Sequence, residues 1–462
     1  MTNPKTPEHG ISLLAAYRVW LRIALLSFGG PAGQIAVMHR ILIEEKRWVS
    51  EERFLHALNY CMLLPGPEAQ QLATYIGWLM HRTIGGLIAG ILFVIPGAIV
   101  ILGLSILYAG FYELKFVEAL FFGIKSAVLA VVVEAVIRIG KRALKNLTMY
   151  IIAVGAFVSI FFLAVPFPIV ILMAAIIGLV GNKLSPSKFK KYTNHKSNTE
   201  NSTPTALVDT AIKTDSLTHT KPSLFNSVRV LSIWLVIWLG PLAIIFFTLG
   251  ENNLFLKEGL FFSKMAVVTF GGAYAVLAYV AQQAVENYGW LAPGEMLDGL
   301  GMAETTPGPL IMIVQFVGFM GAYRNPGMLD PLTAGILGAL ITTWVTFAPC
   351  FLWIFLGAPF IELLRDNKTL AATLTAITAA IVGVILNLVI WFSLHVIFGD
   401  VTERTVGIIH LYIPIWDTIN WAALLISAGA LVATFKYHVG MIPTILVSGA
   451  VGITYFFSVN IA

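Results

Sequence analysis

The chain has 462 residues, of which 58% are hydrophobic and only 11% charged, and its formal net charge is +5. Soluble domains carry roughly 25% charged residues, so this composition excludes an ordinary soluble protein. Many apolar runs reach the roughly 20 residues that a helix needs to cross a bilayer, and their lack of polar alternation excludes a membrane β-barrel. The sequence therefore predicts an all-α, polytopic membrane helical bundle.

The first predicted feature along the chain is an interrupted helix at Phe28-Gly29-Gly30. The residues before it lack the short apolar core and the cleavage site of a removable signal peptide, so we expect the spanning helices themselves to direct insertion. A second interruption, Pro65-Gly66-Pro67, follows within LLPGPEAQQ at residues 63–71. Proline lacks an amide hydrogen and glycine tolerates unusual backbone angles, and both motifs therefore break a helix.

Both interruptions recur later in the chain, which indicates an internal repeat. The matched features keep one offset of 242 residues without a gap: Phe28-Gly29-Gly30 with Phe270-Gly271-Gly272, Trp48 with Trp290, Pro65-Gly66-Pro67 with Pro307-Gly308-Pro309, and Arg22 with Lys264. Farther on, Ala89-Gly-Ile-Leu92 resembles Ala334-Gly-Ile-Leu337 after a small shift. We expect a first repeat at 1–181, a polar linker at 182–227, an extra helix at 228–249 and a second repeat at 250–462.

The distribution of positive charge predicts how the helices are oriented, because lysine and arginine in short loops favour the cytoplasmic side. The basic segments share that side if the segment around Pro65, which Arg53 and Arg82 flank, enters and leaves on it as a re-entrant hairpin. Helices at about 84–109, 118–139, 149–164 and 166–181 then return the linker to the cytoplasm. A full crossing of the Pro65 segment is the alternative, and it would leave the basic loop outside.

The extra helix at 228–249 would place the second repeat in the opposite orientation. The basic loop from Arg40 to Arg53 corresponds to the segment from Gln282 to Asp298, which contains no lysine or arginine. This difference is expected if the two segments face opposite sides of the membrane. The sequence thus predicts two repeats of inverted topology, with Ala462 outside.

Paired helix breaks predict an anion site. The N–H groups and the positive dipole at the N-terminal end of a half-helix attract anions, and two matched breaks near the bilayer midplane would form one pocket. Kinking and close helix packing are the alternative explanation of a single motif. The expected substrate-binding residues are the polar and glycine residues at the breaks with one cation from each repeat: Arg22, Ser27, Gly29, Gly30, Gln34, Gly66, Gln70, Gln71, Lys264, Thr269, Gly271, Gly272, Thr305, Thr306, Gly308 and Gln315.

Charged residues near the breaks have two alternative roles. Arg22 and Lys264 would neutralise a divalent oxyanion, or their side chains would reach the membrane interface from a helix end. Ionised carboxylates would repel an anion, so Glu68 and Glu304 are expected to be proton carriers or counter-ions to these cations.

The helix predicted at 118–139 contains further charges. Lys125 lies on the same helix face as Glu118, and Glu134 and Arg138 have the spacing of an i,i+4 ion pair. Structural ion pairs are one interpretation of these residues. The other is a lining, coupling or counter-ion role for Lys125.

Several classes of chemistry lack their residues in this chain. Cys61 and Cys350 are the only cysteines, and both lie in apolar segments, so we expect them to be packing residues. No cluster of His, Cys and carboxylates has metal-ligand spacing, and no phosphate-binding loop or nucleophilic serine motif occurs. We therefore expect no catalytic residue, metal or cofactor. The basic residues lie mainly in connecting segments, and topology explains them better than a nucleic-acid partner.

Five segments resemble the two-domain chromate ion transporters, the ChrA-type family. They are FGGPAG at 28–33, LLPGPEAQQLATYIGW at 63–78, FVIPG at 93–97, FGGAY at 270–274 and ETTPGP at 304–309. The resemblance covers nearly the whole chain apart from the linker and the extreme N-terminus. It implies efflux of chromate across the bacterial inner (plasma) membrane, driven by the membrane potential or a proton gradient, with sulfate as a similar competitor.

The leading functional hypothesis is therefore a secondary oxyanion transporter that works by alternating access. An anion channel would share the pocket but conduct without a bound-state cycle. An intramembrane enzyme would need a catalytic cluster, and a structural scaffold would not need paired breaks. The expected partners are chromate or a sulfate-like oxyanion, membrane lipid and, as one option, a second copy of the chain in a homodimer.

Overall fold

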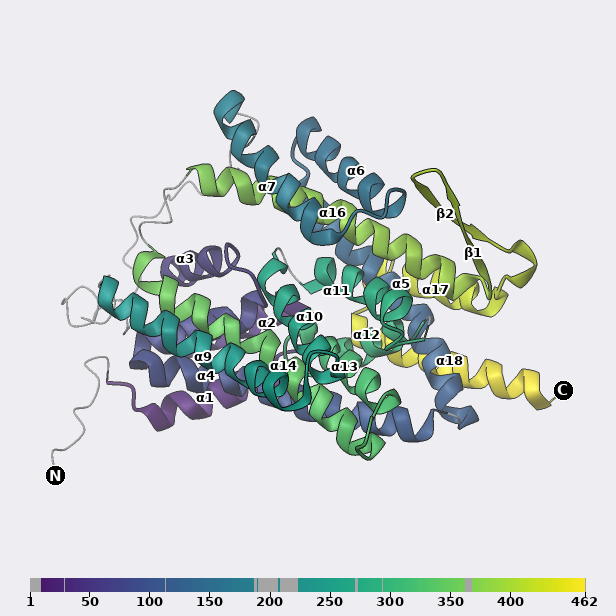
Figure 1. The fold of residues 1–462 in the computed structure, drawn as a ribbon, viewed down its shortest axis with the longest axis horizontal. Helices are drawn as coiled ribbons and strands as arrows, with labels where there is room; N and C mark the ends of the chain where they lie inside the picture. Colours follow the sequence, from purple (N-terminus) through teal and green to yellow (C-terminus); the bar gives the residue numbers. More distant parts are fainter. Residues whose placement is uncertain are drawn as a thin grey trace.

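The computed structural model describes residues 10–28, 30–112, 114–186, 189, 207, 223–270, 273–292, 294–361 and 368–461. Within these ranges nearly all regular structure is helical, as the composition predicts. Helix α1 and helix α18 lie toward opposite ends of the longest axis of the molecule (Figure 1).

The first half of the chain forms short helices followed by long ones. Its elements are α1 (Leu13–Leu26), α2 (Gly30–His39), the π-helix η1 (Arg40–Glu45), α3 (Glu51–Cys61), α4 (Glu68–Phe111), α5 (Lys115–Ala143), α6 (Leu147–Phe161) and α7 (Phe167–Leu184). Helix α9 (Leu224–Leu249) lies between the two halves, at the position expected for the extra helix.

The second half repeats this order of elements. They are α10 (Leu254–Val268), α11 (Ala273–Gln282), the π-helix η4 (Gln283–Asn287), α12 (Glu295–Thr305), η5 (Leu310–Met312), α13 (Ile313–Arg324), α14 (Pro331–Gly357), η6 (Ala358–Phe360), α16 (Lys368–Ile397), β1 (Val401–Val406), β2 (Ile409–Pro414), η7 (Trp416–Thr418), α17 (Trp421–Phe435) and α18 (Met441–Ile461). Even the π-helix recurs, directly after the helix that follows each Phe-Gly-Gly motif.

Helix α4 is two helices joined by a sharp reversal. The backbone leaves helical geometry at His81 and at Arg82, whose φ is 54°. The two parts then pack closely, since a Cβ added to Gly77 would lie 2.4 Å from the carbonyl oxygen of Gly85. Residues that are so close in sequence make this contact only if the helices are antiparallel. The segment after Pro67 is thus one arm of a helical hairpin, a shape that fits the predicted re-entrant segment.

Seven helices of the described ranges are long and apolar enough to span a membrane: α4, α5, α7, α9, α14 with η6, α16 and α18. Helix α6 was expected to be a crossing at 149–164, but it has only 15 residues. At 1.5 Å per residue it is shorter than a hydrocarbon core of about 30 Å. The predicted multi-pass helical bundle is confirmed, with α6 as a shorter apolar helix.

The two halves of the chain pack against each other through their long helices. Helix α5 packs against α17 and α18 of the second half, and α16 packs against α6 and α7 of the first half. Glycines permit both contacts: Gly452 of α18 lies against the backbone of Ala119 in α5, and Gly178 of α7 lies against Thr373 in α16. The hydrophobic core is therefore continuous across the two halves.

The β-hairpin is the one element of the described residues that departs from an all-helical reading. Strands β1 and β2 pair antiparallel, from Val401 with Pro414 to Val406 with Ile409. The hairpin lies between α16 and α17, where the first half has only a short turn between α5 and α6. His410 N donates to Phe162 O (2.7 Å), which attaches it to the turn between α6 and α7.

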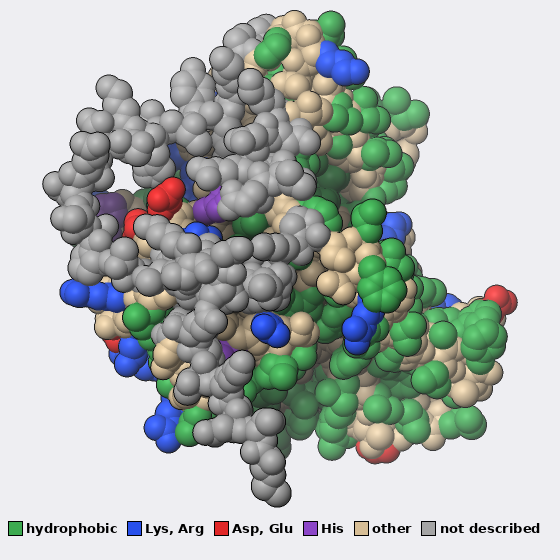
Figure 2. All heavy atoms as spheres, turned by 90° about the vertical axis from the view of Figure 1, so that its left-hand side faces the viewer, with side chains coloured by type: hydrophobic (Ala, Val, Ile, Leu, Met, Phe, Trp, Pro, Cys, Tyr) green, Lys and Arg blue, Asp and Glu red, His purple; other side chains and the backbone are tan. Residues whose placement is uncertain are grey.

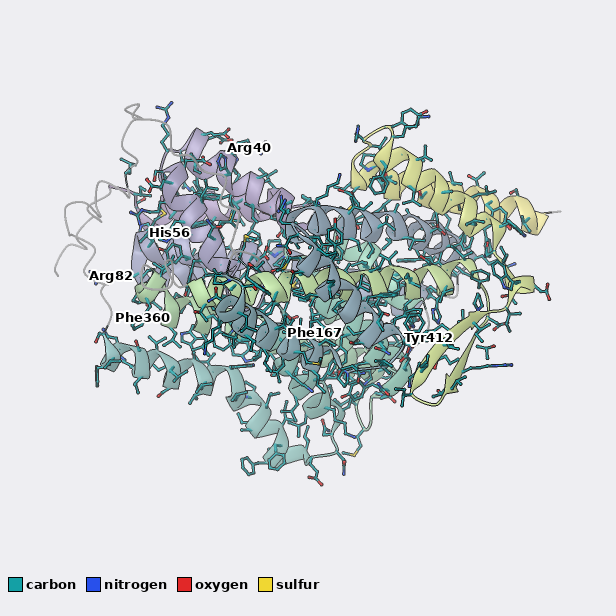
Figure 3. The ribbon with its side chains drawn as sticks, turned by 90° about the horizontal axis from the view of Figure 1, so that it is seen from above. Arg40, His56, Arg82, Phe167, Phe360 and Tyr412 are labelled. Carbon is teal, nitrogen blue, oxygen red and sulfur yellow. The ribbon has the colours of Figure 1, made fainter. Side chains whose placement is uncertain are left out.

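One end of the molecule carries many basic side chains. Figure 2 views the molecule from the end that lies at the left in Figure 1, and Lys, Arg and His side chains are spread over this end. Figure 3 places Arg40, His56 and Arg82 toward that end and Tyr412 of the β-hairpin toward the other. This separation agrees with the charge pattern from which the orientation was predicted, although the side of the membrane remains a prediction.

Candidate functional site

Helices α1 and α10 end at the two Phe-Gly-Gly motifs with the same local geometry. The residue after each helix has left helical angles, with φ −83° and ψ 76° at Ser27 and φ −77° and ψ 87° at Thr269. Ser27 Oγ donates to Ile23 O (2.7 Å), and Thr269 Oγ1 donates to Met265 O (2.6 Å). Both hydroxyl hydrogens are therefore used within their own helix, and both residues turn the chain at the break.

Each Pro-Gly-Pro loop is hydrogen-bonded to the break of the other half. Gly308 N donates to Ser27 O (2.9 Å), and Gly66 N donates to Thr269 O (2.7 Å). Donor and acceptor of one bond are offset from those of the other by the same 242 residues as the sequence repeat. The four interruptions therefore contact one another in a reciprocal crossing, and the expected anion pocket stays a prediction.

A helix of the other half forms a second wall of each loop. A Cβ added to Gly97 of α4 would lie 2.5 Å from Pro307 O, and a Cβ added to Gly66 would lie 2.9 Å from Cys350 Sγ of α14. Gly97 and Cys350 each follow a proline inside their helix. The loops are consequently held on two sides by the opposite half.

Half-helices begin at these interruptions. Helix α4 starts at Glu68 and η5 starts at Leu310, each after the last proline of its loop and without a side-chain cap. Helix α2 starts at Gly30 within the first break. The N–H groups of a first helical turn lack partners inside the helix, so these ends suit an anion. The predicted residues Gly29, Gly271 and Gly272 lie outside the described residues.

The predicted glutamines are buried, and their amide nitrogens are already hydrogen-bonded. The bonds run from Gln34 to Gly308 O (2.5 Å), from Gln315 to Ala98 O (3.0 Å), from Gln71 to Pro65 O (2.7 Å) and from Gln70 to Thr74 Oγ1 (3.1 Å). Two of these, those of Gln34 and Gln315, connect the halves. An anion that enters the breaks must therefore exchange with contacts that the protein makes to itself.

The hydroxyl groups of ETTPGP are engaged in the same manner. Thr305 Oγ1 donates to Gly301 O (3.0 Å), and Thr306 Oγ1 donates to Ala303 O (3.2 Å). Both bonds close the last turn of α12 before the loop. The threonines directly precede the Pro-Gly-Pro loop, and their hydroxyl hydrogens are used within α12.

Several buried oxygen atoms near the breaks have no hydrogen-bond partner within the described residues. They are Oε1 of Gln70, Gln71 and Gln315 and Oε2 of Glu304. Buried acceptors of this kind normally have a donor. A water molecule or a protonated oxyanion would supply one, so the breaks offer acceptors as well as helix ends.

Glu304 lies at the crossing and contacts the first half. The hydroxyl group of Tyr274 donates to its Oε1, and its Oε2 lies 4.0 Å from the position of a Cβ added to Gly30. Arg138 acts on this carboxyl group through space. Glu68, at the start of α4, is partly buried, and the charge of Arg142 acts on it.

The cations predicted beside the breaks lie elsewhere. Arg22 Nη1 lies 2.6 Å from Glu45 Oε2, and 48% of the Arg22 side chain is exposed. Lys264 is exposed on α10. Neither residue forms an ion pair with Glu68 or Glu304 within the described residues. This placement favours the alternative in which the two cations anchor helix ends, so we leave both out of the proposed site.

The partner of Lys125 differs from the one that helix periodicity suggested. Its Nζ lies 3.7 Å from Asp298 Oδ2, whereas Glu118 is exposed. Tyr108 donates a hydrogen bond to the same Asp298 oxygen (2.9 Å). Asp298 is fully buried, and Lys125 therefore compensates a carboxylate of the other half. A coupling role of Lys125 stays a prediction.

Other functional candidates were missed by sequence reasoning. Arg324 forms a bidentate pair with Glu295 (2.6 and 2.7 Å), which fixes α12 to α13. Tyr274 was quoted only as part of a motif, although a tyrosine directly after a helix break is a visible signal. The predicted Glu134 and Arg138 pair is confirmed at 3.8 Å.

Comparison with known proteins supplies an independent test. The sequence model described as Chromate transporter matches residues 14–179 and 256–453. A chromate transport protein of Pseudomonas aeruginosa is 29% identical over 375 residues, which cover 79% of this chain and 77% of that protein. One of Cupriavidus metallidurans is 27% identical over 83% of both chains, and a probable one of Synechococcus elongatus is 25% identical over 88% and 90%. No solved structure matches the chain.

Proposed function

Because this chain belongs to the chromate transporter family, we propose that it is a secondary transporter that exports chromate across the bacterial inner membrane. Chromate is a tetrahedral dianion, and half-helix N-termini bind such oxyanions through backbone N–H groups. Sulfate has a similar shape and charge and is the expected competitor. The residues proposed to surround the anion are those of the two breaks and the two Pro-Gly-Pro loops, with Gln34, Gln70, Gln71 and Gln315 beside them.

The observation that carries this proposal is the reciprocal crossing of the loops. Gly66 is bonded to Thr269, and Gly308 is bonded to Ser27, so each half holds the loop of the other. A relative motion of the halves would alter both bonds at once and would change which half-helix ends face the anion. Such coupled rearrangement around a fixed site is what alternating access requires.

Between the two roles expected for Glu304, the contacts favour a proton carrier. Its described partner is the neutral hydroxyl group of Tyr274, and one carboxyl oxygen has no partner within the described residues. A counter-ion would instead need a cation in contact. We propose that Glu304 exchanges a proton during the cycle and that a proton gradient or the membrane potential drives transport.

The direct test is flux of labelled chromate and labelled sulfate into proteoliposomes of the purified protein, with and without an imposed pH gradient or potential. Gradient-dependent, saturable uptake is expected. Large conductance that does not saturate with substrate would replace the transporter by an anion channel. No flux of either anion under any gradient would remove the proposed function.

A variant separates the proton carrier from a packing role. Glu304→Gln keeps the shape and the Tyr274 contact but holds no exchangeable carboxyl proton. We expect chromate uptake driven by a pH gradient to fall at least about tenfold, while exchange of labelled for unlabelled chromate at equal pH continues. If uptake keeps its pH dependence in this variant, Glu304 does not carry the proton.

A further inference from the structure

A second anion-binding region lies outside the breaks. A cavity of about 680 Å³ opens between the C-terminal part of α5 and the connection from α17 to α18. Its charged lining comes from Glu134, Arg138, Lys141 and Arg142 of α5, with His438 on the opposite wall. Cations exceed carboxylates in this lining, so the cavity attracts anions.

Glu134, the one carboxylate in the lining of the cavity, leaves the lining with a net positive charge. Glu134 Oε1 lies 3.8 Å from Arg138 Nη1, which is too long for a good hydrogen bond. The guanidinium donors of Arg138 therefore stay available to a ligand, and about a third of its side chain is exposed. Arg142 and Lys141 are exposed on the next turn of the helix. Guanidinium groups bind tetrahedral dianions through two parallel hydrogen bonds.

The cavity is electrostatically connected to the breaks. Arg138 acts through space on Glu304 and Tyr274, and Arg142 acts on Glu68. These are the carboxylates at the two Pro-Gly-Pro loops. The charge of an anion bound by these arginines would therefore act on Glu304, the group that we propose to hold a proton.

The described part of α16, the counterpart of α5, lacks the cations of this lining. Helix α16 can be aligned with α5 through their glycine contacts. Gly178 of α7 lies against Thr373 of α16, and Gly449 of α18 lies against Leu120 of α5, so Thr373 corresponds to Leu120 at an offset of 253 residues. At this offset the positions of Glu134, Arg138, Lys141 and Arg142 are occupied in α16 by Asn387, Trp391, Leu394 and His395. Within the described residues, the cluster of lysine and arginine that lines the cavity on α5 has no equivalent at these positions of α16, although the breaks recur in both halves.

We propose that this cavity is the entrance at which the tetrahedral dianion is first captured, with Arg138 and Arg142 as its ligands, before it reaches the breaks. The proposal rests on the proposed function, and it adds a direction: the anion enters on the side where α5 carries its cations. Lys141 raises the local anion concentration at the rim.

The test compares charge-neutral variants in proteoliposomes supplied with labelled chromate. Arg138→Gln and Arg142→Gln are each expected to raise KM about tenfold or more, as for the loss of one charge-assisted hydrogen bond, while the maximal rate at saturating chromate is kept. The KM of the double variant should also depend less on ionic strength than that of the wild type. Arg142→Lys, which keeps the charge but loses the two parallel hydrogen bonds, should have a KM between those of Arg142→Gln and the wild type.

Lys115→Gln is the matched control, because Lys115 is an exposed cation at the other end of α5. It is expected to keep the wild-type KM. Active wild-type protein together with an unchanged KM in both arginine variants would overturn the entrance. A loss of maximal rate without a change in KM, or a rise in KM that Lys115→Gln reproduces, would also overturn it. Absence of flux in the wild type would instead remove the proposed function.

Discussion

The glycine of each Pro-Gly-Pro loop has a backbone conformation that other residues rarely adopt. The φ angle is 117° at Gly66 and 104° at Gly308. In this conformation each glycine N–H faces the carbonyl group of the opposite break. The constraint explains why the motif contains glycine rather than a third rigid residue.

Gly66→Ala is therefore expected to damage both fold and transport. Backbone strain at this angle costs about 1–3 kcal/mol, and the new Cβ would lie 2.9 Å from Cys350 Sγ and from Gln71 Nε2. We expect a lower unfolding temperature and loss of chromate flux. Gly103→Ala is the control, because nothing lies within 4 Å of an added Cβ there. A variant Gly66→Ala with wild-type flux would show that the crossing is not needed for transport.

Some residue partners could be predicted from the sequence, and others could not. The i,i+4 pair of Glu134 and Arg138 follows from helix geometry alone. The partner of Lys125 is Asp298, far along the chain, and no periodicity reveals such a contact. The partner of Arg22 could not be predicted either. Glu45 reaches Arg22 through a π-helix, and no sequence pattern indicates that helix type.

At the scale of elements, the two arms of each helical hairpin pack closely through glycines. Gly77 and Gly85 bring the arms of α4 together, and Gly318 and Gly338 do the same for α13 and α14. In each hairpin, the second arm contains a proline directly before the residue that contacts a Pro-Gly-Pro loop. Hairpin packing consequently sets where the opposite Pro-Gly-Pro loop is held.

We expect Gly85→Val to prevent this packing. A Cβ on Gly85 would lie 2.3 Å from Gly77 O, a backbone atom that cannot move away without opening the hairpin. The yield of folded, monodisperse protein in detergent should fall severely. Gly110→Ala, also in α4 but without any atom within 4 Å of the new Cβ, should be tolerated. Equal yields of the two variants would contradict the hairpin.

These glycine contacts also show that one offset does not hold along the whole repeat. The offset of 242 residues holds for the breaks and loops, but Gly85 corresponds to Gly338 and Gly77 to Gly318. The offset is 241 at Gly77 and 253 at Gly85, so the second hairpin has 12 more residues between its contact glycines than the first, and the connection at 325–330 supplies only part of them. The resemblance of Ala89-Gly-Ile-Leu92 to Ala334-Gly-Ile-Leu337 belongs to neither register. An insertion in a turn leaves the sequence motifs intact but changes the offset between corresponding residues that follow it.

At the scale of the whole molecule, the halves exchange their contacts at every level. Loops cross to the opposite breaks, and α5 and α16 pack against the terminal helices of the other half. Two units that fold independently and then dock would not need such exchange. The arrangement agrees with an internal duplication.

The turns of the two hairpins provide a clean test of inverted topology. Thr83 follows the reversal in α4, and Met328 lies in the connection from α13 to α14, where it is fully exposed. Duplication without inversion would put both turns on one side of the membrane. Inversion, which the extra helix α9 would produce, puts them on opposite sides, with Thr83 in the cytoplasm beside the basic residues of Figure 3.

We expect Thr83→Cys to react with a membrane-impermeant maleimide only from the cytoplasmic side and Met328→Cys only from the other side. The native chain is a suitable background, since Cys61 and Cys350 are 0% and 1% exposed. Ile408→Cys, in the turn of the β-hairpin, should react on the same side as Met328→Cys, because Arg82 and Tyr412 lie toward opposite ends of the molecule (Figure 3). Reaction of Thr83→Cys and Met328→Cys from the same side would exclude inversion, and with it a mechanism in which one half rocks against its inverted counterpart.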